Sequence, residues 1–332
     1  MKCILDNMPY ELHPGELVVL PVDGRAILHR ARGPDPEPLV ELPEDAYDFI
    51  VCETDRYAAT LPTDPTAAYL YHVDWSSGDF QFTRWTPPEG HTTRCAAVTN
   101  TGVIYAGGGT NQTVPDVPFE SMWIIRPGIH GLTTELIPLP QQVVGSGMRK
   151  RIDAMVLKDG RLIVVDNFLL PLWAFFYQVQ PDGSVHEEAV IELEPHSTYE
   201  HVNRAVLGER FIALLSQSAN HGRTSQHISV RDPATLDEIY TFTQSLGSDR
   251  DHTAAPVKHW SRMAFSRDLL FVAAIDQGLG VIDLGKKKPA LKYRSFRGQR
   301  VLAVTTACSQ HGCYVNLHRK GHLPTFQWIP AE

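Results

Sequence analysis

The sequence lacks a cysteine pattern that would support cross-linking or zinc binding. Its 332 residues include five cysteines, an odd number, and no two of them form a C-x-x-C pair. A secreted disulfide scaffold uses an even set of cysteines, and a zinc ribbon needs paired spacings. We therefore expect neither, and a reducing cytoplasm is the simplest location for the protein.

A long apolar run and a surplus of positive charge are also missing. The longest apolar stretch, 168–177, is about half the length of a membrane-spanning helix and contains Pro171. The first residues reach Asp6 without the apolar core of a signal peptide. The 30 Lys and Arg against 38 Asp and Glu give a formal net charge of −8, whereas nucleic-acid binding needs a basic surplus. We expect no membrane insertion, no export and no nucleic-acid binding.

No long helical period separates the apolar segments of the chain. Runs of Val, Ile, Leu, Phe, Tyr and Thr, each about four to nine residues long, are broken by Gly, Pro, Asn and Asp. The hairpin signal Asp-Gly stands between consecutive runs at 23–24, 159–160 and 182–183. This pattern excludes the alternating strands and helices of parallel α/β folds and favours a sandwich, barrel or propeller.

The apolar runs group into a repeated unit of four short strands. The unit is clearest at 201–243 and recurs at 259–296, and its length fits the blade of a β-propeller. We predict an all-β fold, a seven-bladed β-propeller of four-stranded antiparallel blades that forms a single domain over 1–332. The predicted blades are 1–43, 44–90, 91–145, 146–197, 198–250, 251–297 and 298–332. The last is one strand short, and we expect 2–7 to complete it, although this segment also suits the inner strand of the first blade.

One blade resembles a known type of repeat. At 276–291 the sequence Asp-Gln-Gly-Leu-Gly-Val-Ile-Asp leads through a lysine turn and Pro289 to an outer strand. This resembles the repeat of bacterial β-propellers of the LVIVD-like type, and the rest of the chain is similar to WD-repeat and YVTN-type propellers. The Trp-Asp dipeptide of WD repeats is absent from the strand ends. The resemblance implies the fold and no particular activity, because propellers host many functions.

Three proposed innermost strands begin with the same His-x-x-Arg spacing. If equivalent positions in different blades face one end of the central channel, these side chains form a cationic ring. Arginine recognises carboxylate or phosphate in a bidentate manner, so an acidic peptide or small anion is the expected guest. The alternative is a structural role, in which these side chains bind backbone carbonyls between blades. The candidate residues for ligand or partner binding are His91, Arg94, Arg151, His201, Arg204, His259, Arg262 and Arg300.

Two chemical roles for the same residues remain as alternatives. An iron on the propeller axis needs about four converging imidazoles, a number the sequence reaches only with His196 or His252. We therefore predict no metal and no cofactor. A channel-centred hydrolase or lactonase acting on a small anionic substrate would use His201, Arg204 and His259 as catalytic residues.

The function that we expect from the sequence is noncatalytic. A recognisable catalytic motif is missing, and a propeller displays interchangeable loops from several blades. We predict a cytoplasmic protein-interaction scaffold, a subunit of a larger bacterial assembly, that binds protein partners through its loops and the channel mouth.

Overall fold

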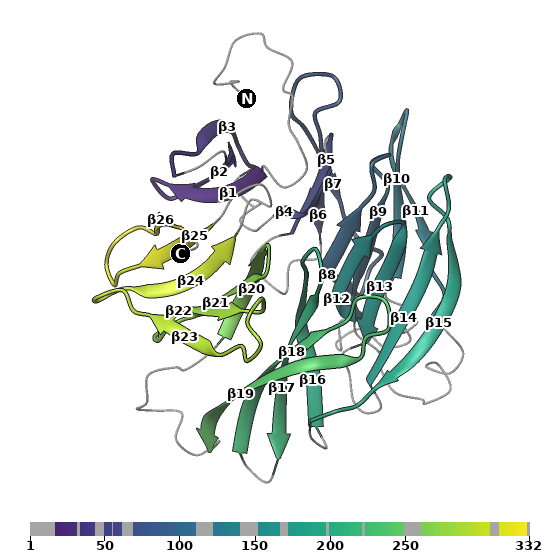
Figure 1. The fold of residues 1–332 in the computed structure, drawn as a ribbon. Coiled ribbons are helices and arrows are strands. Elements are labelled where there is room, and N and C mark those ends of the chain that lie inside the picture. The colour runs from purple at the N-terminus through teal and green to yellow at the C-terminus, as the bar shows by residue number, and fades with distance from the viewer. Residues whose placement is uncertain are drawn as a thin grey trace. The chain divides into compact units, whose positions relative to one another are not determined.

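The described part of the chain consists of β-strands arranged in seven antiparallel sheets (Figure 1). The computed structural model describes residues 17–31, 34–43, 50–54, 56–61, 69–110, 122–139, 152–166, 172–196, 199–220, 223–248, 260–305 and 312–330. Five sheets have four strands, and the first and the last have three described strands each. The prediction of an all-β, seven-bladed β-propeller is confirmed. No helix in these residues is long and apolar enough to cross a membrane.

The strands follow one another along the chain, and each sheet uses consecutive strands. The first three sheets comprise β1 (Leu17–Val22), β2 (Arg25–Arg30), β3 (Glu37–Glu41); β4 (Ile50–Glu53), β5 (Tyr57–Thr60), β6 (Leu70–Asp74), β7 (Gln81–Trp85); and β8 (His91–Val98), β9 (Ile104–Thr110), β10 (Met122–Gly128), β11 (Gly131–Leu136).

The remaining four sheets repeat this plan. They comprise β12 (Ile152–Lys158), β13 (Arg161–Asp166), β14 (Leu172–Val179), β15 (Val185–Leu193); β16 (Tyr199–Leu207), β17 (Ile212–Asn220), β18 (Arg223–Arg231), β19 (Glu238–Ser248); β20 (Trp260–Ser266), β21 (Leu269–Ala274), β22 (Gly278–Asp283), β23 (Leu291–Arg294); and β24 (Arg300–Thr305), β25 (Gly312–His318), β26 (Thr325–Pro330).

Turn residues set the hairpins that join these strands. Asp23 and Gly24 have φ of 49° and 80°, and Asp159 and Gly160 have φ of 51° and 75°. Two consecutive positive φ values match the right-handed twist of the flanking strands, as in type I′ turns. The Asp-Gly signals therefore end β1 and β12 where the sequence predicts hairpins.

Apolar side chains between neighbouring sheets form the core. Two compact units divide the chain: one contains 42–195, and the other contains 15–41 and 203–332. In the first unit, Tyr105 and Phe175 belong to the core between the third and fourth sheets. In the second unit, Trp260 and Ile228 lie between the fifth and sixth sheets. Within each unit, neighbouring sheets thus bury apolar faces against one another, which a single blade could not do alone.

The closing strand predicted at 2–7 lies outside the described residues. Within the second unit the first sheet packs against the last, because Val18 and Leu20 share an apolar cluster with Tyr314. Strands from the two ends of the described chain therefore pack together.

Candidate functional site

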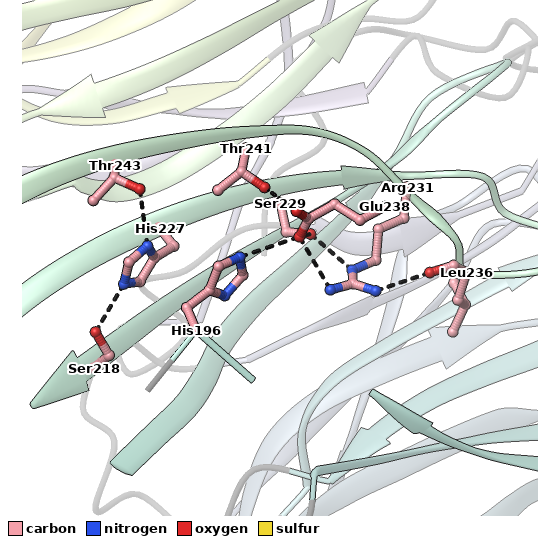
Figure 2. A network of polar contacts seen from close by, with 9 residues as sticks. All are labelled: His196, Ser218, His227, Ser229, Arg231, Leu236, Glu238, Thr241 and Thr243. Carbon is pink, nitrogen blue, oxygen red and sulfur yellow. Dashed lines mark hydrogen bonds and ion pairs between the residues drawn. The ribbon is translucent and has the colours of Figure 1, made fainter. Parts of the chain in front are cut away.

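The fifth sheet, β16–β19, concentrates the buried polar side chains of the described chain. Eight of the 14 buried polar or charged residues lie in this sheet. They are Glu200, Ser216, Ser218, Thr224, Gln226, His227, Ser229 and Arg231. Buried polar groups are stable only when they find hydrogen-bond partners, so this sheet must contain a network. Figure 2 shows a large part of it.

The carboxylate of Glu238, at the start of β19, is the centre of the network (Figure 2). Its Oε2 accepts hydrogen bonds from Ser229 Oγ at 2.6 Å and from Arg231 Nη2 at 3.2 Å. His196 Nε2 lies 3.1 Å from the same oxygen. Thr241 donates its hydroxyl to Oε1. One carboxylate therefore connects two strands and the segment that precedes β16.

Arg231 ends β18 and is almost fully buried, with 6% of its surface exposed. Its Nε donates to Ser229 Oγ at 2.7 Å, and its Nη1 donates to the carbonyl of Leu236 at 2.9 Å. With the ion pair to Glu238, all three guanidinium nitrogens have partners. A buried guanidinium is tolerated only under these conditions.

The turn between β18 and β19 delivers the Leu236 carbonyl to this arginine. Asp232 Oδ1 accepts hydrogen bonds from the backbone N–H groups of Ala234 and Thr235, which is an Asx turn. Leu236 has a positive φ of 62°, and its N–H donates to the Asp232 carbonyl. The local sequence Asp-Pro-Ala-Thr thus forms a tight turn, and the carbonyl of Leu236 after it points toward the Arg231 guanidinium.

Two histidines extend the network toward β17. The rings of His196 and His227 stack with centroids 4.5 Å apart and planes inclined by 8°. His227 Nε2 is 2.7 Å from Ser218 Oγ, and its Nδ1 is 3.0 Å from Thr243 Oγ1. A hydroxyl can donate or accept, so both ring nitrogens of His227 are satisfied in either tautomer.

The surroundings of Glu238 favour its ionised form. Partial burial alone would raise the pKa of this carboxyl group. The hydrogen bonds from Ser229 and Thr241 and the charges of His196 and Arg231 together outweigh burial and lower the pKa below its ordinary value of 4.5. Glu238 is therefore a carboxylate at neutral pH.

The contact between Ser218 and His227 has the form of a nucleophile and its base. Three features oppose that role. Ser218 is only 4% exposed, His227 directs its other nitrogen to the hydroxyl of Thr243, and the carboxylate of Glu238 contacts the other histidine. A nucleophile needs access to substrate and a base oriented by an acceptor. The arrangement instead ties three strands together, and no metal-binding group of three His, Cys, Asp or Glu occurs in the described residues.

A second set of contacts joins the fifth sheet to the sixth. The side chain of Gln226 is fully buried; its Oε1 accepts from the N–H of Trp260 at 2.8 Å, and its Nε2 donates to the Trp260 carbonyl at 3.0 Å. Gln244 Nε2 donates to Gln226 Oε1, and Trp260 Nε1 donates to Tyr293 Oη at 2.9 Å. The side-chain amide of Gln226 thus bonds both backbone groups of Trp260 at the start of β20, as the backbone of a neighbouring strand would do.

The His-x-x-Arg residues occupy different positions relative to a recurring β-bulge. The first strands of five sheets skip one residue in their pairing with the second strand. The skipped residues are Val51, Arg94, Asp153, Ser261 and Leu302. Arg94 is itself the skipped residue, whereas Arg262 follows the skipped Ser261, so the two arginines are one position out of register.

The remaining predicted site residues have varied surroundings. The ring of His91 packs edge-on against Trp123 with centroids 5.2 Å apart. Arg204 is half-buried in β16. Arg300 is largely exposed, and its Nε lies 2.7 Å from Asp276 Oδ1. Arg151, His259 and the side chain of His201 lie outside the described residues.

The sequence interpretation missed the network of the fifth sheet, although a signal was present. His227, Ser229 and Arg231 alternate along β18, which pairs with strands on both sides. Three polar residues on one face of a central strand predict a buried polar cluster, because that face has limited access to water.

Comparison with known proteins shows similarity of structure alone. No family model matches the sequence, and no curated protein matches it. The β-propeller domain of Cps50 (Swd1) from Myceliophteria thermophila is similar over 100% of both chains, with a TM-score of 0.59 and 10% identity. U3-55K is similar over 97% of both chains, with a TM-score of 0.59 and 10% identity. The WD40 repeats of RRP9 cover 97% of this chain and 96% of their own, with a TM-score of 0.56 and 12% identity.

These similarities support the β-propeller fold. They give no support to a bacterial origin or to the YVTN and LVIVD subtypes that the sequence suggested.

Proposed function

We propose that the chain is a noncatalytic protein-interaction scaffold, a subunit of a larger assembly that binds partners through its loops and the channel mouth. The observation that carries this proposal concerns the cluster that most resembles a catalytic site, the one around Ser218 and His227. Its polar groups are hydrogen-bonded to other residues of the fifth sheet. Ser218 and Arg231 are buried, and their polar groups are used by neighbouring strands. The polar network thus connects the strands of the fifth sheet. Partners would then bind to exposed side chains of the surface loops.

Exposed apolar side chains at turns support a role in binding. Ile129 is 99% exposed at the turn between β10 and β11, and Leu323 is 60% exposed between β25 and β26. Rigid hairpins that present single apolar side chains are suited to insertion into a pocket on a partner. The likeness to WD40-type propellers agrees with this proposal through the fold.

The eight His and Arg residues predicted from the sequence form the proposed ligand or partner site, for acidic peptide segments, at the channel mouth. Arg204 and Arg262 are its half-buried members in the second unit. An arginine fork is suited to the carboxylates of such a segment. A cytoplasmic location belongs to the same proposal.

The test is affinity purification of the tagged protein from its native source, followed by size-exclusion chromatography. We expect a partner to co-elute at fixed stoichiometry and to be lost from an Arg204→Ser/Arg262→Ser variant. The matched control is Arg210→Ser, which changes an exposed arginine paired with Asp268 at 3.4 Å. Elution of the protein alone, together with hydrolysis of lactone or ester substrates by the purified chain, would show that the proposal is wrong.

A further inference from the structure

The outer strand of the sixth sheet, β23, lies in a strongly basic stretch of the chain (Figure 1). Between positions 284 and 300 the sequence has seven Lys or Arg residues and no Asp or Glu. The chain as a whole has 30 Lys and Arg against 38 Asp and Glu, so the remainder is more acidic than the net charge of −8 indicates. All seven cations are exposed, and we call them the basic stripe: Lys286, Lys287, Lys288, Lys292, Arg294, Arg297 and Arg300.

The basic stripe follows β23 from one end to the other. The three lysines at 286–288 stand in the turn between β22 and β23, and Arg297 follows the strand. Lys292 and Arg294 lie in the strand itself. Among the outer strands of the described sheets, only β23 has two Lys or Arg residues, and it has no acid.

Only two members of the basic stripe are paired within the described chain. Lys286 Nζ is 2.9 Å from Asp283 Oδ2. Arg300 Nε is 2.7 Å from Asp276 Oδ1. The other five cations form no ion pair with a described residue. Most of the positive charge of the stripe is therefore available to a partner.

The backbone edge of β23 is also available. One side of the strand pairs with β22, and no described strand pairs with the other side. Leu291 packs against the core between the fifth and sixth sheets, and Tyr293 Oη accepts a hydrogen bond from Trp260 Nε1. Lys292 and Arg294 alternate with these two residues, so their side chains stand on the opposite face of the strand. The edge thus combines unpaired backbone groups with two cations on one face.

We propose that the edge of β23 binds an extended acidic segment of a partner protein, which joins the sixth sheet as an added strand. Side chains on one face of a strand recur every two residues, about 6.6 Å apart. A segment with Asp or Glu at every second position places carboxylates beside Lys292 and Arg294, and opposite charges on neighbouring strands stabilise a sheet. The ends of such a segment extend toward the cations at 286–288 and at Arg297.

The same charges disfavour two other occupants. Lysine on an outer strand protects it against pairing with a copy of itself, because two β23 strands would bring like charges together. A long polyanion such as RNA would extend beyond the basic stripe and meet the acidic remainder of the chain. Charges act over about 8 Å at physiological ionic strength, so a short acidic segment experiences mainly the stripe. This site goes beyond the one proposed at the channel mouth and does not depend on it.

The test measures the binding of two labelled octapeptides by fluorescence anisotropy. Both alternate threonine with a charged residue, which is glutamate in one peptide and lysine in the other. We expect the wild-type chain to bind the glutamate peptide, with an affinity that falls as salt is added, and not to bind the lysine peptide. Lys292→Glu/Arg294→Glu should bind the glutamate peptide at least about tenfold more weakly and should bind the lysine peptide instead. Gain of the second peptide shows that this variant is folded.

Two controls separate local charge and strand pairing from total charge. Arg56→Glu/Arg223→Glu makes the same change of net charge at two exposed arginines outside the sixth sheet, and its affinity for the glutamate peptide should equal that of the wild type. A glutamate peptide with N-methylated amides keeps its charges but cannot donate hydrogen bonds to the edge. It should bind at least about tenfold more weakly than the unmodified peptide.

Several outcomes would overturn the proposal. They are failure of the glutamate peptide to bind, equal losses in the two double variants, and equal binding of the methylated and unmodified peptides. Tighter binding of a short single-stranded RNA would assign the basic stripe to nucleic acid. Association between copies of the chain that Lys292→Glu/Arg294→Glu abolishes would assign the edge to self-assembly, and either result would reject an acidic partner segment.

Discussion

The imidazole rings of His196 and His227 lie face to face, 4.5 Å apart and within 8° of parallel. His196 precedes β16, whereas His227 lies in the middle of β18, so the stack fixes a connecting segment onto the sheet. Nε2 of His196 lies 3.1 Å from Glu238 Oε2, and Ser218 and Thr243 contact the two ring nitrogens of His227.

Replacing Glu238 by glutamine should destabilise the fold. The glutamine side chain still reaches Ser229 and Arg231, but it removes the negative charge that balances the buried guanidinium. Glu238 is one-third exposed, so water weakens the effect, and we expect a loss of about 1–3 kcal/mol in the free energy of unfolding. Urea denaturation followed by tryptophan fluorescence measures this loss.

The matched control is Glu135→Gln. Glu135 pairs with Arg126 at 2.6 Å, but its side chain is well exposed. Exposed pairs of this kind contribute about 0–1 kcal/mol. Equal losses in the two variants would contradict the special position of Glu238.

The stabilising effect of Glu238 should disappear in acid. Its pKa is below the ordinary value of 4.5 in the folded chain, because hydrogen bonds from Ser229 and Thr241 and nearby positive charges outweigh partial burial. A lowered pKa contributes stability above the pKa of the unfolded chain, and that contribution is lost as the pH falls through the folded value. The difference in melting temperature between wild type and Glu238→Gln should therefore be constant near pH 6 and shrink below about pH 4.5.

A Ser229→Ala variant provides the control for this pH profile. It removes one of the hydrogen bonds that lower the pKa of Glu238. The acid-dependent part of the stability should be smaller in this variant than in the wild type. A profile that grows toward low pH would have the opposite sign and would reject the assignment.

Gln226 should be intolerant of apolar replacement. Its amide satisfies both backbone groups of Trp260, at 2.8 and 3.0 Å, in a fully buried position. Gln226→Leu leaves a buried N–H and a buried C=O without their partner, and we expect a loss of about 2–4 kcal/mol in the free energy of unfolding. Gln226→Glu should be worse, because a carboxylate has no N–H for the Trp260 carbonyl and carries a buried charge.

Gln178 is the matched control for this substitution. Its amide donates to the carbonyl of Gly160 at 3.2 Å, but the site is exposed and water can replace the contact. Gln178→Leu should change the free energy of unfolding by less than about 0.5 kcal/mol. A similar loss in the Gln178 and Gln226 variants would show that burial of the amide does not matter.

The fold could be predicted because its signals are local. Alternating apolar residues define each strand, and Asp-Gly pairs such as Asp159–Gly160 define hairpins within a few residues. The strands of each sheet fall within one of the predicted blade segments. Within each sheet, strand order follows chain order, so each strand pairs with its neighbours in the sequence.

The polar network could not be predicted in the same way, because its members come from distant segments. His196, Ser218, His227 and Glu238 meet only when three strands and a loop are in place. The β-bulges of the first strands are also not visible in the sequence pattern. A bulge shifts the register by one residue, so the equal His-x-x-Arg spacings do not place Arg94 and Arg262 in equivalent positions.

Substitution of Gly108 should show that the run Gly107–Gly109 serves packing. A Cβ atom on Gly108 would lie 1.6 Å from the carbonyl oxygen of Thr92, where β8 approaches β9 beside the bulge. This contact is with backbone, so no side chain can rotate away, and the two strands must separate. We expect Gly108→Ala to lower the free energy of unfolding by at least about 3 kcal/mol or to prevent folding. Gly285→Ala is the matched control, because a Cβ atom there is 3.3 Å from the flexible carboxylate of Asp283. Circular dichroism and urea denaturation distinguish the two variants, and a fully stable Gly108→Ala protein would contradict the close approach of β8 to β9.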